Sequence, residues 1–340
     1  MIYEAVRAAG LLAEGRPVVV MFSGGRDSTC LLDLAVRVAG AAAVSAMHAN
    51  YRLRGAADAD ERHCAEVCEA LGVQLDVRRP VRAGGADGSG NLQAWARAER
   101  YRAAAELAIA RGADVAAGHT RSDQVETILY RIASSPSRRA LLGMRSRDDS
   151  DPPVIRPLLD VTREQTGTYC SERGLRWRDD ESNQSSAYAR NRIRRELVPA
   201  LERVHPAARE NLLALAAVLR DEADVLDAVV QTALSARGTD ADGVGQIELA
   251  RLRELAPAVR RLVLQRLADA VVKRPAAGVA RRADEVAQLR EGGELHLPQG
   301  ISARVRGGVL TLGRTERERR PQPAPGPGRG NPPGAERPID

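Results

Sequence analysis

Apolar runs of strand length alternate with helical patterns along the first half of the chain. The runs are short, rich in β-branched residues and bounded by polar or glycine residues, which is typical of buried strands. Strands that alternate with helices indicate an α/β fold, in which helices cover both faces of a parallel sheet. The predicted strands are 17–22, 43–48, 73–78 and 114–118, and the predicted helices are 28–38, 58–71, 92–111 and 122–133.

The second half of the chain is mostly helical in pattern. A short extended piece over 154–159 precedes Thr162 and Gln165, which have the spacing of a capping box at a helix start. After a break over 238–245, helices are predicted near 249–255, 258–271 and 280–289, followed by a small antiparallel meander over 294–297, 301–306 and 308–312. We therefore predict an α/β domain over 1–205, a helical linker over 206–236, a smaller α+β domain over 237–313 and a disordered, Arg-, Pro- and Gly-rich tail over 314–340.

Composition narrows the class of protein. The 340 residues suffice for two domains, and 44% hydrophobic with 28% charged residues is typical of a globular protein. The net charge of +6 comes almost wholly from arginine, since Lys273 is the only lysine, and it is compatible with a polyanionic partner. Neither a signal peptide nor a membrane-spanning segment is expected. The four cysteines form neither a disulfide framework nor a Cys-x-x-Cys motif, so we expect reduced cysteines and a cytoplasmic location.

A glycine loop directly follows the first predicted strand. Its sequence is Ser-Gly-Gly-Arg-Asp-Ser-Thr over residues 23–29, at the start of a helix. Backbone N–H groups of such a loop point at one spot, and a residue without a side chain lets an anion approach closely. The hydroxyl groups add hydrogen-bond donors, and Asp27 is suited to a Mg²⁺ ion beside phosphate groups. No Gly-Lys-Ser/Thr follows, so this is a phosphate loop of another kind than the usual nucleoside-triphosphate loop.

A second motif opens the helix predicted after the fourth strand. Over residues 118–127 it reads Gly-His-Thr-Arg-Ser-Asp-Gln-Val-Glu-Thr. His119 lies on the loop, and Asp123 and Glu126 share one helical face. The two carboxylates are suited to bind Mg²⁺, although in isolation they would equally be favourable charges in the first turn of a helix.

The loop at 23–29 resembles the pyrophosphate loop of the N-type ATP pyrophosphatases, which split ATP between the α and β phosphates. Together with the motifs at 91–101, 118–127, 156–159, 177–183 and 188–195, it resembles the bacterial tRNA(Ile)-lysidine synthetase family from about Val18 to Leu201. The resemblance implies an adenine nucleotide α-hydrolase-like fold for 1–205 and a tRNA-binding role for the small domain over 237–313. It also implies ATP and Mg²⁺ as cofactors, and as partners free L-lysine and a tRNA(Ile) with a CAU anticodon. A homodimer is left open.

The resemblance implies a role for each matched residue. The pyrophosphate would be held by the loop residues Ser23, Gly24, Gly25, Arg26, Asp27 and Ser28. The catalytic positions would be Asp27, Arg100, His119, Asp123 and Glu126. The three acids among them would bind the metal, and Asp123 and Glu126 could instead bind the lysine ammonium. Arg97 and Arg100 would offset charge on the α-phosphate, and the tRNA-binding residues would be Arg97, Arg190, Asn191, Arg192, Arg194 and Arg195.

The implied reaction has two steps. ATP adenylates the carbon-2 oxygen of the wobble cytidine, and the ε-amine of lysine then attacks that carbon and releases AMP. The chain departs from the family pattern at three places. Tyr51 stands where a histidine is common, which puts the adenine pocket in doubt. Gln93 stands where a glutamate is common, and 134–140 lacks a glycine-rich run, but none of the three departures removes a metal or phosphate ligand.

Other functions remain open at this point. A tRNA 2-thiolation enzyme of the same superfamily would need a reactive cysteine or a Cys-x-x-Cys motif, and the sequence contains neither. A small-molecule ATP pyrophosphatase would have little use for the basic segment at 190–195. A non-catalytic tRNA-binding protein would gain little from three acids that face RNA.

Overall fold

The protein divides into two compact units, Met1–Arg220 and Asp221–Asp340. The computed structural model describes residues 2–52, 55, 57–82, 92–135, 138–148, 150–178, 189–234 and 245–315. The predicted tail therefore falls almost wholly outside the described residues, as do parts of the motifs at 177–183 and 188–195. The finer domain boundaries of the sequence analysis stay predictions.

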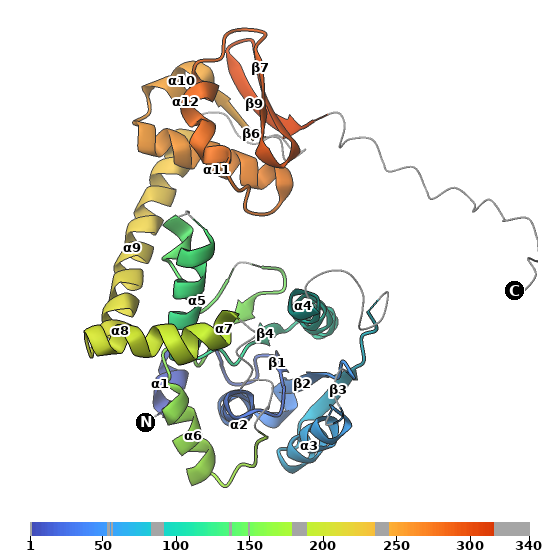
Figure 1. The fold of residues 1–340 in the computed structure, drawn as a ribbon. Coiled ribbons are helices and arrows are strands. Elements are labelled where there is room, and N and C mark those ends of the chain that lie inside the picture. The colour runs from blue at the N-terminus through green and yellow to red at the C-terminus, as the bar shows by residue number, and fades with distance from the viewer. Residues whose placement is uncertain are drawn as a thin grey trace, which may run out of the picture. The chain divides into compact units, whose positions relative to one another are not determined.

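The first unit is built on a parallel sheet of five strands (Figure 1). The strand order is β3-β2-β1-β4-β5, and every neighbouring pair runs parallel. The order reverses between β1 and β4, and in open parallel sheets ligands bind at such a reversal, beyond the carboxyl ends of the strands. The strands are β1 (Val18–Met21), β2 (Val44–Ala49), β3 (Gln74–Arg78), β4 (Asp114–Ala116) and β5 (Val154–Ile155).

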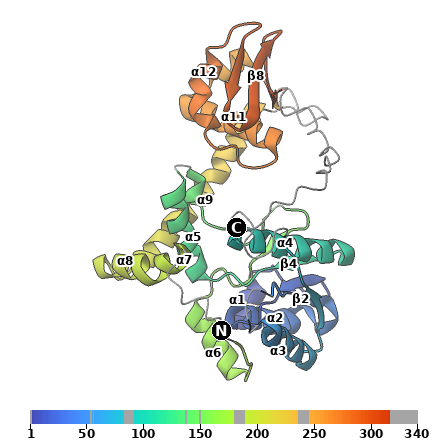
Figure 2. The same cartoon turned by 45° about the vertical axis from the view of Figure 1, so that its right-hand side comes forward.

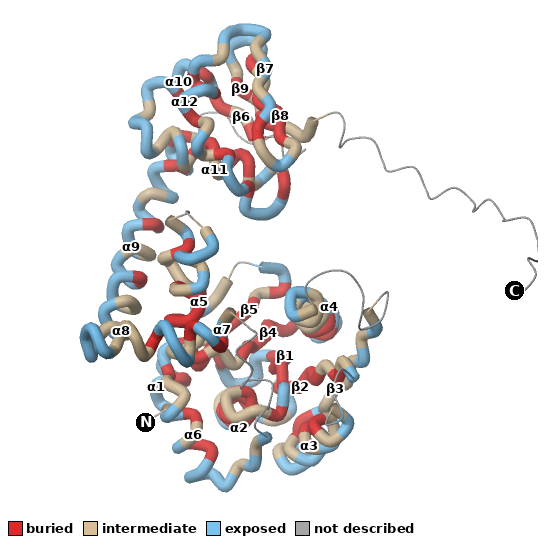
Figure 3. Tube along the Cα trace, viewed as in Figure 1, coloured by how far each residue is buried: buried red, intermediate tan, exposed pale blue. Residues whose placement is uncertain are grey.

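Helices cover both faces of this sheet, which confirms the predicted fold class (Figure 3). The reason is that successive side chains of β1 point to opposite faces of the sheet. Val18 and Val20 pack into one core with residues of α2 and α6, whereas Val19 and Met21 pack into a second core with residues of α4. The helices of this unit before the basic segment are α1 (Ile2–Ala8), α2 (Arg26–Ala39), α3 (Ala57–Ala70), α4 (Leu92–Arg111), α5 (Arg121–Ser134) and α6 (Arg163–Glu172), with 3₁₀ turns η1 (Ala41–Ala43) and η2 (Arg138–Ala140).

Within the described residues of 173–234, four helical pieces follow α6. They are α7 (Ala189–Arg192), the π-helical turn η4 (Ile193–Leu197), α8 (Val198–Val204) and α9 (Ala208–Leu234), whose last part belongs to the second unit. The predicted capping box of α6 is confirmed, because the Gln165 amide N–H donates to Thr162 Oγ1 at 3.2 Å and Thr162 N–H donates to Gln165 Oε1 at 2.8 Å.

The second unit has one strand more than the predicted meander of three. Its antiparallel sheet has the order β6-β9-β8-β7 and shares a core with α11 (Figure 2). Gly245 was placed in a break, but it begins β6, and a Cβ atom there would lie 2.9 Å from Leu267 Cδ2 of α11. The glycine is therefore a site of close packing. The elements are β6 (Gly245–Glu248), α10 (Leu249–Glu254), α11 (Pro257–Val272), η5 (Val279–Arg282), α12 (Ala283–Ala287), β7 (Glu294–Leu297), η6 (Pro298–Gly300), β8 (Ile301–Arg306) and β9 (Val309–Arg314).

Candidate active site

The glycine loop at the end of β1 is held in shape by its own hydroxyl groups. Ser28 Oγ donates to the Gly25 carbonyl at 2.9 Å, and Thr29 Oγ1 donates to the same carbonyl at 3.0 Å. Ser23 N–H donates to Ser28 Oγ at 3.3 Å, and the two serine hydroxyls lie 3.0 Å apart. The loop is thus closed upon itself before any ligand binds, with its N–H groups at the positive end of α2.

Gly24 has a backbone conformation and surroundings that exclude a side chain. Its φ is +76°, and a Cβ atom there would lie 3.0 Å from Cys64 Sγ and 3.2 Å from His63 Cδ2, both on α3. Its carbonyl accepts a hydrogen bond from Arg178 N–H at 3.0 Å. The loop is therefore packed between α3 and the segment before the undescribed 179–188.

Asp27, in the first turn of α2, binds two residues of α6. Its carboxylate accepts a hydrogen bond from Arg163 Nε at 3.2 Å and another from Thr166 Oγ1, while Arg26 Nε lies 3.4 Å away. The sequence analysis missed Arg163 and Thr166. Their spacing of three residues, which places both on one helical face, was the signal that could have found them.

Asp123 combines a helix-capping contact with a contact to the basic segment. Its Oδ2 accepts from both Thr120 N–H and Thr120 Oγ1 at 2.9 Å, which caps the start of α5. Its Oδ1 lies 3.7 Å from Arg194 Nη2. Although burial opposes ionisation, hydrogen bonds from Thr120 and the positive Arg163 hold the pKa of this carboxyl below its usual value. Asp123 is therefore an anion, and the helix-cap role does not exclude a role in the site.

Glu126 is almost fully buried and forms a two-point ion pair with Arg194. Arg194 Nε lies 2.6 Å from Oε1 and Nη2 lies 3.0 Å from Oε2. Arg194 comes from the π-helical turn η4, and the acids Glu126, Asp123 and Asp27 together raise its pKa against the effect of burial. Two of the three predicted acids, Glu126 and Asp123, thus contact one guanidinium, and the charge of the third, Asp27, also acts on it.

His119 is neutral at physiological pH. Burial is the main cause that lowers its pKa to about 3, and Arg97, Arg156 and Arg190 add to the shift, whereas Asp123 opposes it. Both positive side chains and the Asp123 carboxylate therefore act on the ring. Arg97 also contacts Tyr101, with 3.2 Å between Nη2 and the hydroxyl oxygen and 4.8 Å between Cζ and the ring centroid.

The basic segment has an inward and an outward side. Asn191 is buried and Arg194 reaches Glu126, whereas Arg190, Arg192 and Arg195 are exposed. Arg190 Nη2 donates to Thr127 Oγ1 at 3.4 Å, so this side chain stays near α5. The structure therefore brings Arg194 to the predicted acids and leaves the guanidinium groups of the outward side accessible to a larger partner.

Tyr51, which departs from the family pattern, and the nearby His48 both have structural contacts. Tyr51 donates from its hydroxyl to the Ala96 carbonyl of α4 and meets the Trp95 ring edge-on, with 5.6 Å between ring centroids. Arg100 lies near Tyr51, since it acts to lower the pKa of this phenol, although burial raises it overall. His48 Nδ1 is buried 3.0 Å from the Phe22 carbonyl, and thus supports the strand end that leads into the loop.

The arrangement fits a Mg²⁺ ion held mainly by substrate phosphates. Within the described part of the chain, no three His, Cys, Asp or Glu side chains are placed to bind a metal. Mg²⁺ commonly takes only one or two carboxylates together with phosphate oxygens. The carboxylates of Asp123 and Asp27 suit this role, although both oxygens of Asp27, like those of Glu126, also have protein partners.

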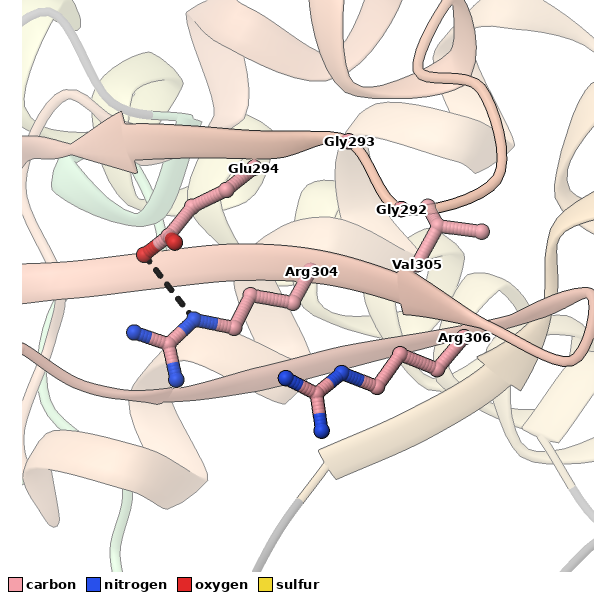
Figure 4. Close-up of a pocket in the computed structure, with 6 residues that line it drawn as sticks. All are labelled: Gly292, Gly293, Glu294, Arg304, Val305 and Arg306. Carbon is pink, nitrogen blue, oxygen red and sulfur yellow. Dashed lines mark ion pairs between the residues drawn. The ribbon is translucent and has the colours of Figure 1, made fainter.

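Described residues line a cavity in each of the two units. One of about 160 Å³ lies in the first unit at the acid cluster, and its lining includes Glu126, Glu164, Arg163, Arg194 and Arg209. The other, of about 270 Å³, lies in the second unit beside the 2.9 Å ion pair of Glu294 and Arg304 (Figure 4). Only the first contains residues predicted for chemistry. None of the helices that the structure describes has both the length and the apolar character to cross a membrane.

The sheet, its reversal point and the self-closed glycine loop define a nucleotide-binding protein of the PP-loop class. In agreement, the PP-loop domain family matches residues 3–201. The U34-tRNA thiolase NcsA from Methanococcus maripaludis, solved with its 4Fe-4S cluster, superposes with a TM-score of 0.54 and 17% identity over 64% of this chain and 78% of that chain. At this identity the likeness shows the fold alone.

Curated relatives identify the family within the PP-loop class. The tRNA(Ile)-lysidine synthase of Salinispora tropica is 36% identical over 91% of this chain and 95% of its own length. Those of Pseudomonas fluorescens and Azoarcus are 36% and 34% identical over 75% and 87% of this chain, which spans only 59% and 65% of their lengths. The chain belongs to the tRNA(Ile)-lysidine synthase family of PP-loop proteins.

Proposed function

We propose that this protein is a cytoplasmic ligase that joins free lysine to carbon 2 of the wobble cytidine in the CAU anticodon of a tRNA(Ile). ATP adenylates the carbon-2 oxygen and releases pyrophosphate. The ε-amine of lysine then attacks carbon 2, and AMP leaves with that oxygen. The product nucleoside is lysidine.

The observation that carries this proposal is the ion pair between Arg194 and Glu126. It joins the basic segment to the motif that follows β4, and Arg163 joins Asp27 of the glycine loop to the same acids. A polyanion on the exposed arginines would therefore lie beside the ATP loop. A small-molecule ATP pyrophosphatase would not need this connection.

The residues of the site divide the work between two substrates. The N–H groups of the loop and the Ser23 hydroxyl would bind pyrophosphate oxygens at the positive end of α2, and the Ser28 hydroxyl, which donates to the Gly25 carbonyl, would hold the loop in the shape that this requires. Asp27 and Asp123 would hold a Mg²⁺ ion, and the ion would offset negative charge on the phosphate oxygens. A single-stranded anticodon base can leave its stack and enter the site from the basic segment.

The cavity at the acid cluster has the charges that free lysine requires. Glu126 and Glu164 offer carboxylates for an ammonium group, and Arg163, Arg194 and Arg209 offer guanidinium groups for the lysine carboxylate. This arrangement does not require a homodimer, which the sequence left open.

The thiolation alternative is disfavoured by the state of the cysteines. All four are buried and free. Burial raises the pKa of the Cys64 thiol, and it raises that of Cys68 to about 12, so neither is a thiolate at neutral pH. A nucleophilic sulfur would have to be both ionised and accessible.

The function is tested by incubating the protein with tRNA(Ile), ATP, Mg²⁺ and lysine and measuring the mass of the wobble nucleoside. We expect a gain of one lysine less one water, together with AMP and pyrophosphate in nucleotide chromatography. An unmodified cytidine, or ADP as the main product, would contradict the proposal. A sulfur-containing nucleoside in a reaction supplied with a sulfur donor would favour the thiolation alternative.

The outward arginines provide a further prediction. The double variant Arg192→Gln and Arg195→Gln is expected to weaken tRNA binding and to reduce the salt slope of log Kd by about one for each phosphate group that the segment no longer binds. Arg190 is left unchanged because it contacts α5. Filter binding across a salt series measures the slope.

The matched control for that variant removes two exposed arginines elsewhere, Arg7→Gln on α1 and Arg62→Gln on α3. This control lowers the net charge by the same amount as the first double variant. A difference in tRNA binding between the two variants therefore depends on where the charge lies and not on how much charge is lost. Equal slopes for the two double variants would show that the segment at 190–195 does not contact RNA phosphates.

A further inference from the structure

Arg163 contacts a carboxylate oxygen that the proposed Mg²⁺ site also uses. Its Nε lies 3.2 Å from Asp27 Oδ2, and it begins α6, which packs against α2 (Figure 1). The other oxygen, Oδ1, accepts a hydrogen bond from Thr166 Oγ1 and lies 3.4 Å from Arg26 Nε. Two cations at one carboxylate repel each other, so a guanidinium and a metal ion weaken each other's contact there.

The charge of Arg163 acts on the second proposed metal ligand as well. Burial raises the pKa of the Asp123 carboxyl, but hydrogen bonds at the start of α5 and the charge of Arg163 hold it below its usual value. Asp27 and Asp123 also act on one common group, since both raise the pKa of Arg194 against the effect of burial, together with Glu126. Neighbouring carboxylates repel each other unless a cation offsets their charge. Arg163 therefore supplies to Asp27 and Asp123 the kind of charge that a metal ion supplies.

Arg163 is held less firmly than the other guanidinium at these acids. Within the described part of the chain, its one ion pair is the contact of Nε with Asp27. Arg194, by contrast, is held at two points by Glu126. The Arg163 side chain is 27% exposed and lines the cavity at the acid cluster, where Glu164 offers it a second carboxylate. It can therefore leave Asp27 without becoming a buried charge that lacks a partner.

We propose that Arg163 and Mg²⁺ compete for Asp27. Arg163 pairs with this carboxylate while no nucleotide is bound, and it turns into the cavity at the acid cluster when ATP brings Mg²⁺ to the site. The phosphate oxygens of ATP complete the ligands of the ion, which lets it displace the guanidinium. Arg163 is thus a positioning residue, and it makes strong Mg²⁺ binding depend on ATP. The inference deepens the proposed function and rests on its use of Mg²⁺ with ATP.

The test measures binding of Mn²⁺, which takes the same oxygen ligands as Mg²⁺, to the full chain without nucleotide. Electron paramagnetic resonance of the free ion gives the affinity. Arg163→Gln is expected to bind Mn²⁺ at least about tenfold more tightly than the wild type, because a positive charge beside two carboxylates is removed. Arg163→Met keeps the apolar stem of the side chain and serves with the same expectation if Arg163→Gln does not fold.

A purely structural role of Arg163 predicts the opposite result. Loss of an anchor between α6 and α2 would leave Asp27 less well placed and would leave Mn²⁺ affinity unchanged or weaker. Either outcome in a folded variant overturns the proposal, whereas a gain in affinity cannot come from a damaged site.

ATP is the second variable of the test. We expect ATP to raise the Mn²⁺ affinity of the wild type more than that of Arg163→Gln, because the variant has no guanidinium for the ion to displace. By linkage, the difference between the two factors equals the gain of the variant without ATP. If ATP raises the affinity of both proteins by the same factor, Arg163 does not leave Asp27 and the proposal is overturned.

Two controls assign the gain to Asp27. Adding Asp27→Asn to Arg163→Gln is expected to abolish the gain, and a gain that persists would place the ion elsewhere and overturn the proposal. Arg7→Gln, exposed on α1, lowers the net charge by the same amount and is expected to bind Mn²⁺ as the wild type does. An equal gain in Arg7→Gln would also overturn it. No tRNA or lysine is present, so a failure of lysidine formation would leave these results readable.

Discussion

Asp123→Asn is expected to reduce lysidine formation by at least about 100-fold, a size typical of the loss of one electrostatic group in an active site. The amide oxygen of asparagine can still accept from Thr120 N–H, so the cap of α5 is kept. What is lost is the negative charge beside Arg194 and Arg163. Single-turnover formation of the modified nucleoside measures the chemical step, and tRNA affinity is expected to stay unchanged.

Asp114→Asn is the control for the loss of a buried carboxylate. Asp114 begins β4, at the opposite end of the strand from His119, and pairs with Arg147 at 2.8 Å and Arg16 at 2.9 Å. Its neutralisation is expected to lower the free energy of unfolding and to leave turnover per folded molecule intact. If Asp123→Asn turned over like the wild type, the role of Asp123 would be limited to capping α5.

The parts of the fold that the sequence predicted well are those fixed by local patterns. The helix predicted over 92–111 is α4 with the same bounds, because its apolar positions recur over five turns without a glycine or proline. β6 was missed because a four-residue strand beginning with a glycine has no such signal, and its pairing with β9 joins residues more than sixty apart in the chain.

The same division applies to the site. The glycine loop was predictable because most of the hydrogen bonds that shape it lie within residues 23–29. The pairing of Asp27 with Arg163 and of Glu126 with Arg194 was not, although three of these residues were singled out. A sequence pattern shows which groups carry charge, but the partner of each charge depends on packing between helices that are far apart in the chain.

Gly24→Ala is expected to lower ATP affinity by about 100-fold or more, a large effect for the addition of a single methyl group. The added Cβ would lie 3.0 Å from Cys64 Sγ in a residue whose φ is +76°, a conformation that costs an alanine about 1 kcal/mol or more. Because α3 and the Arg178 N–H hold the loop on that side, the strain cannot be relieved without moving the N–H groups that face the phosphates. Equilibrium binding of ATP in the absence of tRNA measures the loss.

Gly40→Ala separates this local effect from backbone strain in general. Gly40 ends α2 with a φ of +87°, and a Cβ atom there would have no neighbour within 4 Å. It is expected to lower the free energy of unfolding by about 1 kcal/mol and to leave ATP affinity unchanged. Adding Cys64→Ala to Gly24→Ala removes the nearest clashing atom and is expected to restore part of the affinity. If Gly24→Ala binds ATP like the wild type, the loop amides are not the pyrophosphate ligands, and the phosphates must bind elsewhere along the carboxyl edge of the sheet.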